Sequence, residues 1–161
     1  MNERIILPGT TDRKDIRTAL IPQLRSLFAD ANDAIATMAN MTAVIKDAFG
    51  WHWVGFYRVM GTDLVLGPFQ GPVACDRIGY GKGVCGAAWK EERTIIVPDV
   101  DQFPGHIACS SLSRSELVTP VRDREDSIKA VLDIDSIELD DFTEEDAAFF
   151  DSITEHLRPL L

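Results

Sequence analysis

The sequence lacks the features that would place the protein in a membrane, outside the cell or on a nucleic acid. No stretch approaches the roughly 20 consecutive apolar residues of a membrane span, and the N-terminus has no apolar core of a secretory signal. Acidic residues outnumber basic ones, 26 to 16, so the net charge of −10 disfavours phosphate backbones and anionic lipid. We therefore expect a cytoplasmic protein that binds neither nucleic acid nor membrane.

Cysteine is scarce as well, and its positions exclude the usual structural uses of the residue. Cys75, Cys85 and Cys109 cannot all pair within one chain, and they lie ten and twenty-four residues apart without a C-x-x-C pair. This spacing is poor material for a structural zinc site, although His106, three residues before Cys109, leaves a weak Cys/His alternative. We therefore expect no metal, and either thiol chemistry or burial as small apolar side chains.

What is present is the composition of an ordinary globular domain. Of the 161 residues, 45% are hydrophobic and 26% are charged, and no internal repeat or low-complexity run occurs. This length favours one domain over residues 1–161, with residues 1–12 as an extended or poorly ordered N-terminal segment.

The order of the expected elements predicts an α+β fold. Helices are expected over 13–29, 31–49 and 140–161, with a short helix over 83–93. Strands are expected over 51–60, 62–67, 72–78, 94–100, 116–123 and 127–136. We expect one central antiparallel sheet, with the N- and C-terminal helices packed on one face and site-forming loops on the other.

Local signals support the two longest helices. Gly50 occupies a helix C-cap position, and Thr143 and Asp146 have the spacing of a capping box. Apolar residues at steps of three and four predict the buried stripes, which are Ile35, Met38, Met41, Ile45 and Phe49 in the first helix and Phe150, Ile153, Leu157 and Leu160 in the second.

Each cysteine lies near the end of a predicted element, where functional side chains often occur. Cys85 begins the short helix after a glycine-rich segment, so the helix dipole is expected to favour its thiolate. Cys109 lies in a loop rich in Gly, Ser and Pro, and Cys75 lies in the short strand before the glycines. Any one of them could be a small buried apolar residue, but their shared placement favours a functional set.

The stretch VLDIDS places two carboxylates on one face of a strand. Asp133 and Asp135 alternate with apolar residues, so the aspartates point away from the core and lie ~7 Å apart along the strand. Glu116 opens the neighbouring strand. Such a cluster could hold a cationic amine, or mutual repulsion could raise one pKa so that a neutral acid donates a proton. The alternative is an ordinary solvated sheet face.

The aromatic strand over 51–60 offers one further candidate for a binding site. Trp51, Trp53 and Tyr57 alternate with apolar residues, and some of these side chains must belong to the core. An exposed tryptophan in this strand could pack against a methyl or thioether group of a ligand.

Taken together, four segments resemble the free methionine-(R)-sulfoxide reductases, a family of single GAF domains. They are WVGFYRV, GPFQGPVACDRIGYGKGVCGAAW, VPDVDQFPGHIACSSLSRSELVTPV and AVLDIDS. The resemblance runs from about residue 31 to the C-terminus and includes the spacing of the three cysteines. A generic GAF sensor would share the fold and the WVGFY strand but not this cysteine pattern.

The resemblance implies a thiol-dependent reduction of free methionine-(R)-sulfoxide without a cofactor. A thiolate attacks the sulfoxide sulfur, methionine leaves, and a second cysteine condenses with the sulfenic acid to form a disulfide that thioredoxin or dithiothreitol reduces. Cys109 matches the nucleophile, and Cys75 and Cys85 match the resolving positions. The opposite assignment, in which Cys85 is the nucleophile, is left open. The implied substrate-binding residues are Trp53, Glu116, Asp133 and Asp135.

Two readings compete with this enzyme, a GAF domain that senses a small molecule and a thiol sensor that signals through its own disulfide. An acidic pocket would suit a cyclic phosphate poorly. The chain also departs from the family after Cys109, where Ser110 and Arg114 replace an acidic residue and an asparagine. Arg114 would lower the pKa of the thiol if it pointed inward. A homodimer is left open.

Overall fold

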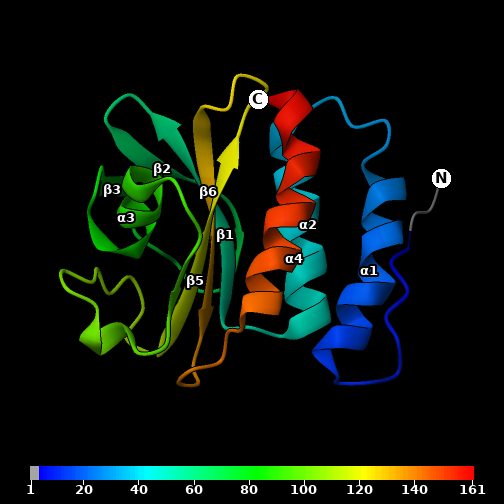
Figure 1. The fold of residues 1–161 in the computed structure, drawn as a ribbon, viewed down its shortest axis with the longest axis horizontal. Coiled ribbons are helices and arrows are strands. Elements are labelled where there is room, and N and C mark those ends of the chain that lie inside the picture. Colours follow the sequence, from blue (N-terminus) through cyan, green and yellow to red (C-terminus); the bar gives the residue numbers. More distant parts are fainter. Residues whose placement is uncertain (1–3) are drawn as a thin grey trace.

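Six strands form one antiparallel sheet through the middle of the molecule, in the order β3-β2-β1-β6-β5-β4 (Figure 1). The strands are β1 (Trp53–Met60), β2 (Asp63–Gln70), β3 (Arg77–Gly79), β4 (Ile95–Val97), β5 (Ser115–Arg122) and β6 (Ile128–Ser136). The computed structural model describes residues 4–161, and neighbouring strands within that range pair antiparallel. The α+β class with a central antiparallel sheet is confirmed.

Three helices cover one face of this sheet (Figure 1). α2 (Ala34–Phe49) and α4 (Glu144–Thr154) lie against the strands, and α1 (Arg13–Leu27) lies outside them. The opposite face carries the short helix α3 (Gly83–Glu91) and the 3-10 turn η1 (Val100–Gln102). The N- and C-terminal helices therefore share one face, as expected. None of the described helices has the length and apolar character that a membrane crossing requires.

Capping residues set the helix ends near the expected positions. Gly50 ends α2 with a φ of 71°, a left-handed conformation that glycine adopts without steric cost. Thr143 and Asp146 form the expected capping box at the start of α4. α4 does not run to residue 161 but changes at Glu155 into the 3-10 helix η2 (Glu155–Leu160), which contains Pro159. Proline has no N–H for an α-helical hydrogen bond, so the expected helix was too long.

Two apolar cores lie on the two faces of the sheet. The larger core joins the sheet to the helices, and it includes Met38, Met41, Ile45, Leu132, Ile134, Phe150, Ile153 and Leu157. Ile35 was expected in the same stripe but is 44% exposed, because the buried stripe of α2 begins at Thr37. The smaller core on the other face contains Trp53, Tyr57, Val84, Cys85, Val118 and Val131.

The strand expected over 72–78 is wrong for most of its length, because only residues 77–79 pair in the sheet. Two backbone carbonyls of this segment accept hydrogen bonds from side chains instead of from a neighbouring strand. The Trp53 indole N–H donates to the carbonyl oxygen of Pro72 at 3.0 Å, and the Tyr57 hydroxyl donates to that of Cys75 at 3.0 Å. Cys75 therefore lies in an irregular segment that is held by hydrogen bonds from two side chains of β1.

The N-terminal residues 4–12 form neither helix nor strand, but they are attached to α1. The backbone N–H of Ile6 donates to the Gln23 side chain at 2.7 Å, and the Gln23 amide donates to the carbonyl of Ile6 at 2.9 Å. Ile5 and Leu7 pack against the larger core. An extended segment therefore continues the fold here, and residues 1–3 lie outside the described residues.

Candidate active site

A pocket opens on the face of the sheet opposite the long helices, between α3, the loop over 98–114 and strands β1, β5 and β6. Six of the seven residues expected in the site line it, and they are Trp53, Cys85, Cys109, Glu116, Asp133 and Asp135. Cys75, the seventh, is covalently joined to Cys109 by a disulfide. Lys82 and Ser113 also line it although we did not expect them, and so do Tyr57 and His106, which were weaker candidates.

Strand register brings three of these residues into one transverse row. Asp135 on β6 lies opposite Trp53 on β1 and also opposite Glu116 on β5. Asp133 lies two residues back on the same face of β6, while Leu132 and Ile134 point into the larger core. The expected alternation of VLDIDS is therefore confirmed.

The carboxyl cluster is not a solvated sheet face, so that alternative is wrong. Glu116 is only 6% exposed and Asp133 only 7%. Burial raises the pKa of Glu116 well above its usual 4.5, and the charge of Asp135 raises it further. Burial also raises the pKa of Asp133, and the charge of Glu116 adds to the effect. The cluster therefore retains protons at a pH where exposed carboxyls have lost theirs.

One carboxylate oxygen of the cluster lacks a hydrogen-bond donor within the described part of the chain, which indicates that the cluster shares a proton. Oδ1 of Asp133 is buried and accepts no hydrogen bond from a donor among the described residues. A buried carboxylate oxygen without a donor is costly, whereas a protonated carboxyl can share its proton with a neighbouring carboxylate. Glu116 is that neighbour. The pair can therefore hold a proton that is available to a ligand in the pocket.

Two of the cysteines are joined and the third is free. Cys75 and Cys109 form a disulfide across 34 residues of sequence, with their Cα atoms 5.4 Å apart. Cys85 is a free, buried thiol in the first turn of α3. Burial raises the pKa of this thiol well above its usual value, and the charges of Asp133 and Glu116 raise it further. The expectation that the helix dipole favours the Cys85 thiolate is therefore wrong, because burial beside carboxyls outweighs the dipole.

A metal site is the other use that these groups could have. The Cys85 sulfur and carboxylate oxygens of Glu116 and Asp133 lie within 4.8 Å of one another, which is close enough for shared ligation. His106 lies on the edge of this group, with Nε2 3.4 Å from Oε2 of Glu116, and burial lowers the pKa of its imidazole. In the disulfide state Cys109 has no thiolate to offer beside His106. Proton sharing is the other use that the carboxyls of this group allow.

Trp53 forms a fixed wall of the pocket rather than an exposed surface. Its side chain is 3% exposed and stacks on Phe69, with ring centroids 5.4 Å apart. Two glycines make room for it. A Cβ atom at Gly55 would lie 2.2 Å from the indole ring, and one at Gly71 would lie 2.6 Å from it. The expectation of an exposed tryptophan in the strand predicted over 51–60 is wrong, because Trp51 is buried as well.

The two residues expected to depart from the family pattern, Ser110 and Arg114, lie in different places. Arg114 is exposed and does not line the pocket, so the expectation that it acts on a thiol is not supported. Its backbone is held instead, since its N–H donates to the carbonyl of Ser136 at 2.7 Å. Ser110 lines the pocket beside Cys109, and its hydroxyl lies 3.0 Å from Nε2 of His52.

Comparison with known proteins gives one consistent result. The family model described as GAF domain matches residues 31–161. The chain is 53% identical to GAF domain-containing protein A of Dictyostelium discoideum, over 83% of this chain and 85% of that protein. It is 43% identical to the free methionine-R-sulfoxide reductase of Escherichia coli, over 75% of this chain and 73% of that protein. A crystal structure of the enzyme of the same name from Neisseria meningitidis, in complex with its substrate, has a TM-score of 0.90 to this fold at 46% identity, covering 96% of this chain and 93% of that chain.

Proposed function

Because the chain belongs to the free methionine-R-sulfoxide reductases of the GAF-domain family, we propose that it reduces free L-methionine-(R)-S-oxide to L-methionine. The observation that carries the proposal is the Cys75–Cys109 disulfide at a pocket that also contains a proton-retaining carboxyl cluster. Reduction of a sulfoxide needs two electrons and two protons; the reduced thiols of Cys75 and Cys109 can supply the electrons as they form the disulfide, and the carboxyl cluster can deliver a proton.

Cys109 is the proposed nucleophile. Its thiolate attacks the sulfoxide sulfur, and the oxygen then takes up a proton and passes from the methionine sulfur to the Cys109 sulfur. Methionine leaves, and Cys109 is left as a sulfenic acid. The thiol of Cys75 then attacks the Cys109 sulfur, which forms the disulfide and releases water. The pairing seen in the structure supports Cys75 as the resolving residue, and the burial of Cys85 beside two carboxyls disfavours a thiolate there.

The carboxyl cluster is proposed to supply the proton and to bind the ammonium. A proton shared by Glu116 and Asp133 can pass to the sulfoxide oxygen as the S–O bond weakens. Asp135, less buried than these two, is suited to face the ammonium of a free amino acid. A methionine residue within a peptide has no ammonium, so selectivity for the free form follows. Trp53 is proposed to contact the S-methyl group.

Turnover requires a dithiol that reduces the disulfide. Cys75 and Cys109 are both only partly buried, so a thiolate from outside can reach a sulfur atom and form a mixed disulfide. Thioredoxin is the proposed reductant in the cell, and dithiothreitol is its substitute in an assay. Each cycle then consumes one dithiol and releases one methionine and one water.

The test is direct. The protein is mixed with dithiothreitol and either the R or the S epimer of free methionine sulfoxide, and methionine is quantified over time. Catalytic consumption of the R epimer alone is expected. Consumption of neither epimer would refute the proposed enzymatic activity and would favour a small-molecule sensor or a thiol sensor. Equal consumption of both would remove the stereochemical assignment.

A further inference from the structure

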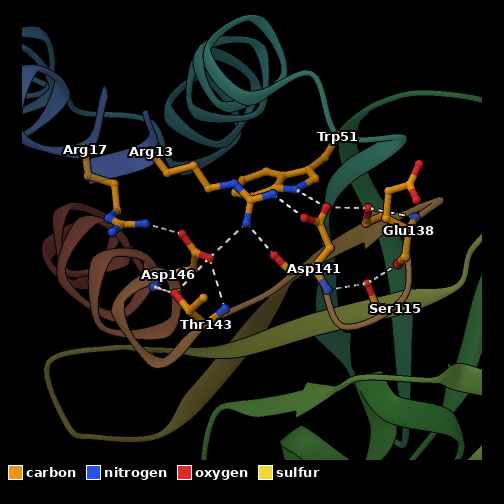
Figure 2. Close-up of polar contacts among 9 residues, drawn as sticks. Arg13, Arg17, Trp51, Ser115, Glu138, Asp141, Thr143 and Asp146 are labelled. Carbon is orange, nitrogen blue, oxygen red and sulfur yellow. Dashed lines mark hydrogen bonds and ion pairs between the residues drawn. The ribbon is translucent and has the colours of Figure 1, made fainter. Parts of the chain in front are cut away.

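Asp141 lies at the centre of a polar network on the helix side of the sheet, behind the pocket (Figure 2). One carboxylate oxygen accepts hydrogen bonds from the Trp51 indole, at 3.1 Å, and from the hydroxyl of Ser136. The other oxygen binds the guanidinium of Arg13. The backbone N–H of Asp141 donates to the hydroxyl of Ser115 at 3.4 Å. One residue therefore contacts the ends of three strands and a helix.

Both serines that contact Asp141 lie next to a residue of the proposed site. Ser136 directly follows Asp135, and Ser115 directly precedes Glu116. Ser115 and Ser136 pair across β5 and β6, and the next pair in the register is Glu116 with Asp135. Alternate residues of a strand point to opposite faces, so the serines face Asp141 while the acids face the pocket.

The third contact reaches the other end of the same row. Trp51 lies two residues before Trp53, which is the first residue of β1, and Trp53 lies opposite Asp135. The Trp51 ring is also packed beneath the Arg13 guanidinium, 5.1 Å from its centroid. A shift at any of these anchors would therefore move the row formed by Trp53, Asp135 and Glu116.

We propose that Asp141 is a positioning residue for the reductase reaction, which holds the ends of β1, β5 and β6 so that Trp53, Asp135 and Glu116 keep one row facing the pocket. The inference rests on the proposed function for its chemistry. Asp141 itself does not line the pocket, so it acts through the residues that it anchors.

The network also offers a control of matched kind. Arg13 contacts Asp141 and also Asp146, whereas Arg17 forms an ion pair with Asp146 at the start of α4. Arg17→Ala therefore weakens the attachment of α1 without touching the three strand ends. Asp141→Ala removes the acceptors for Trp51 and Ser136, and Asp141→Asn keeps one oxygen that can accept from them.

The test compares these three variants with the unmutated protein. Activity is measured well below each melting temperature, which is recorded for each variant. Asp141→Ala is expected to lose about tenfold or more in kcat/KM, the scale of a misplaced catalytic group. It should also move the alkaline limb of the pH profile to lower pH, because carboxyls that separate hold their shared proton less tightly. Arg17→Ala should lower the melting temperature but keep kcat/KM within about twofold, and Asp141→Asn should recover most of the activity lost in Asp141→Ala.

A second readout does not depend on turnover. In ¹⁵N-labelled protein, Asp141→Ala should shift the indole N–H resonances of both Trp51 and Trp53, whereas Arg17→Ala should leave that of Trp53 in place. An unchanged kcat/KM in Asp141→Ala, or an equal loss in Arg17→Ala, would overturn the positioning role. Absence of turnover in the unmutated protein would refute the proposed function instead, and the Trp53 resonance would still decide whether Asp141 sets the row.

Discussion

Nε2 of His52 lies 3.0 Å from the hydroxyl oxygen of Ser110, across 58 residues of sequence. His52 stands between Trp51 and Trp53 at the start of β1, and Ser110 follows Cys109 in the loop over 98–114. The contact therefore connects the strand that carries the pocket wall with the loop that carries the proposed nucleophile. Ser110 is one of the two residues at which we expected this chain to depart from the family pattern.

We expect Ser110→Ala to slow the first turnover while changing stability little. Loss of one hydrogen bond costs about 1 kcal/mol, which corresponds to a rate loss of about fivefold if the bond orients Cys109 during attack. Rapid-quench measurement of methionine formation from reduced protein gives the rate. Ser111→Ala, at the exposed neighbouring position, is the control and should keep the rate. Equal rates in both variants would show that the contact does not orient the thiol.

The three cysteines should separate cleanly by variant. Cys109→Ser should abolish methionine formation even with dithiothreitol, because sulfur attack needs its thiolate. Cys75→Ser should form one equivalent of methionine and stop at a sulfenic acid in the absence of external thiol, which dimedone labelling followed by mass spectrometry detects. Cys85→Ser should also complete a first turnover. If Cys85→Ser alone abolishes that turnover, Cys85 is the nucleophile and the roles are reversed.

Glu116→Gln and Asp135→Asn should each lower kcat/KM by ~10²- to 10⁴-fold, the range for loss of a general acid or a charge partner. Both changes are nearly isosteric and lie on the pocket side, so the fold should persist in circular dichroism. N-acetyl-methionine sulfoxide lacks the ammonium and should be a poor substrate for the unmutated protein. If the free and acetylated compounds have equal kcat/KM, the ammonium-binding role of Asp135 is wrong and only proton donation remains.

Stability should fall as the pH rises through the range in which the cluster keeps its protons. The usual pKa values are 4.5 for Glu116 and 3.8 for Asp133, and both are raised in the fold, so the unfolded chain releases these protons at lower pH. The folded state then binds more protons than the unfolded one, and the free energy of unfolding decreases with pH above those usual values. Urea unfolding between about pH 5 and pH 8 measures this slope. The double variant Glu116→Gln, Asp133→Asn should flatten it, and an unchanged slope would place the effect in other groups.

Local periodicity accounts for the part of the site that the sequence could predict. The alternation in VLDIDS needs only Leu132 and Ile134 in the core to set both aspartates on the other face, and the structure has them there. The short turn between β5 and β6 predicts that these strands pair, which brings Glu116 beside the aspartates. Both features are determined by the sequence within a few residues, where side-chain pattern and backbone geometry agree.

Long-range contacts account for what could not be predicted. The segment over 72–75 has strand propensity, but the carbonyls of Pro72 and Cys75 accept hydrogen bonds from the side chains of Trp53 and Tyr57. That irregular course brings Cys75 to Cys109, and no spacing rule distinguishes it from Cys85 as the partner. The raised pKa of Cys85 likewise depends on its burial beside Asp133, a contact that the helix position alone does not reveal.

α1 lies before residue 31, where the GAF domain match begins, yet its arginine reaches carboxylates 128 and 133 residues further along the chain. Ribosomes add about 5–20 residues per second, so roughly 6–26 s separate the synthesis of Arg13 from that of Asp141. A helix forms within about a microsecond, so α1 can be helical long before α4, with which Leu20 and Leu24 share a core, has been synthesised. The ion pair between Arg13 and Asp141 can therefore form only after all six strands of the sheet have been synthesised.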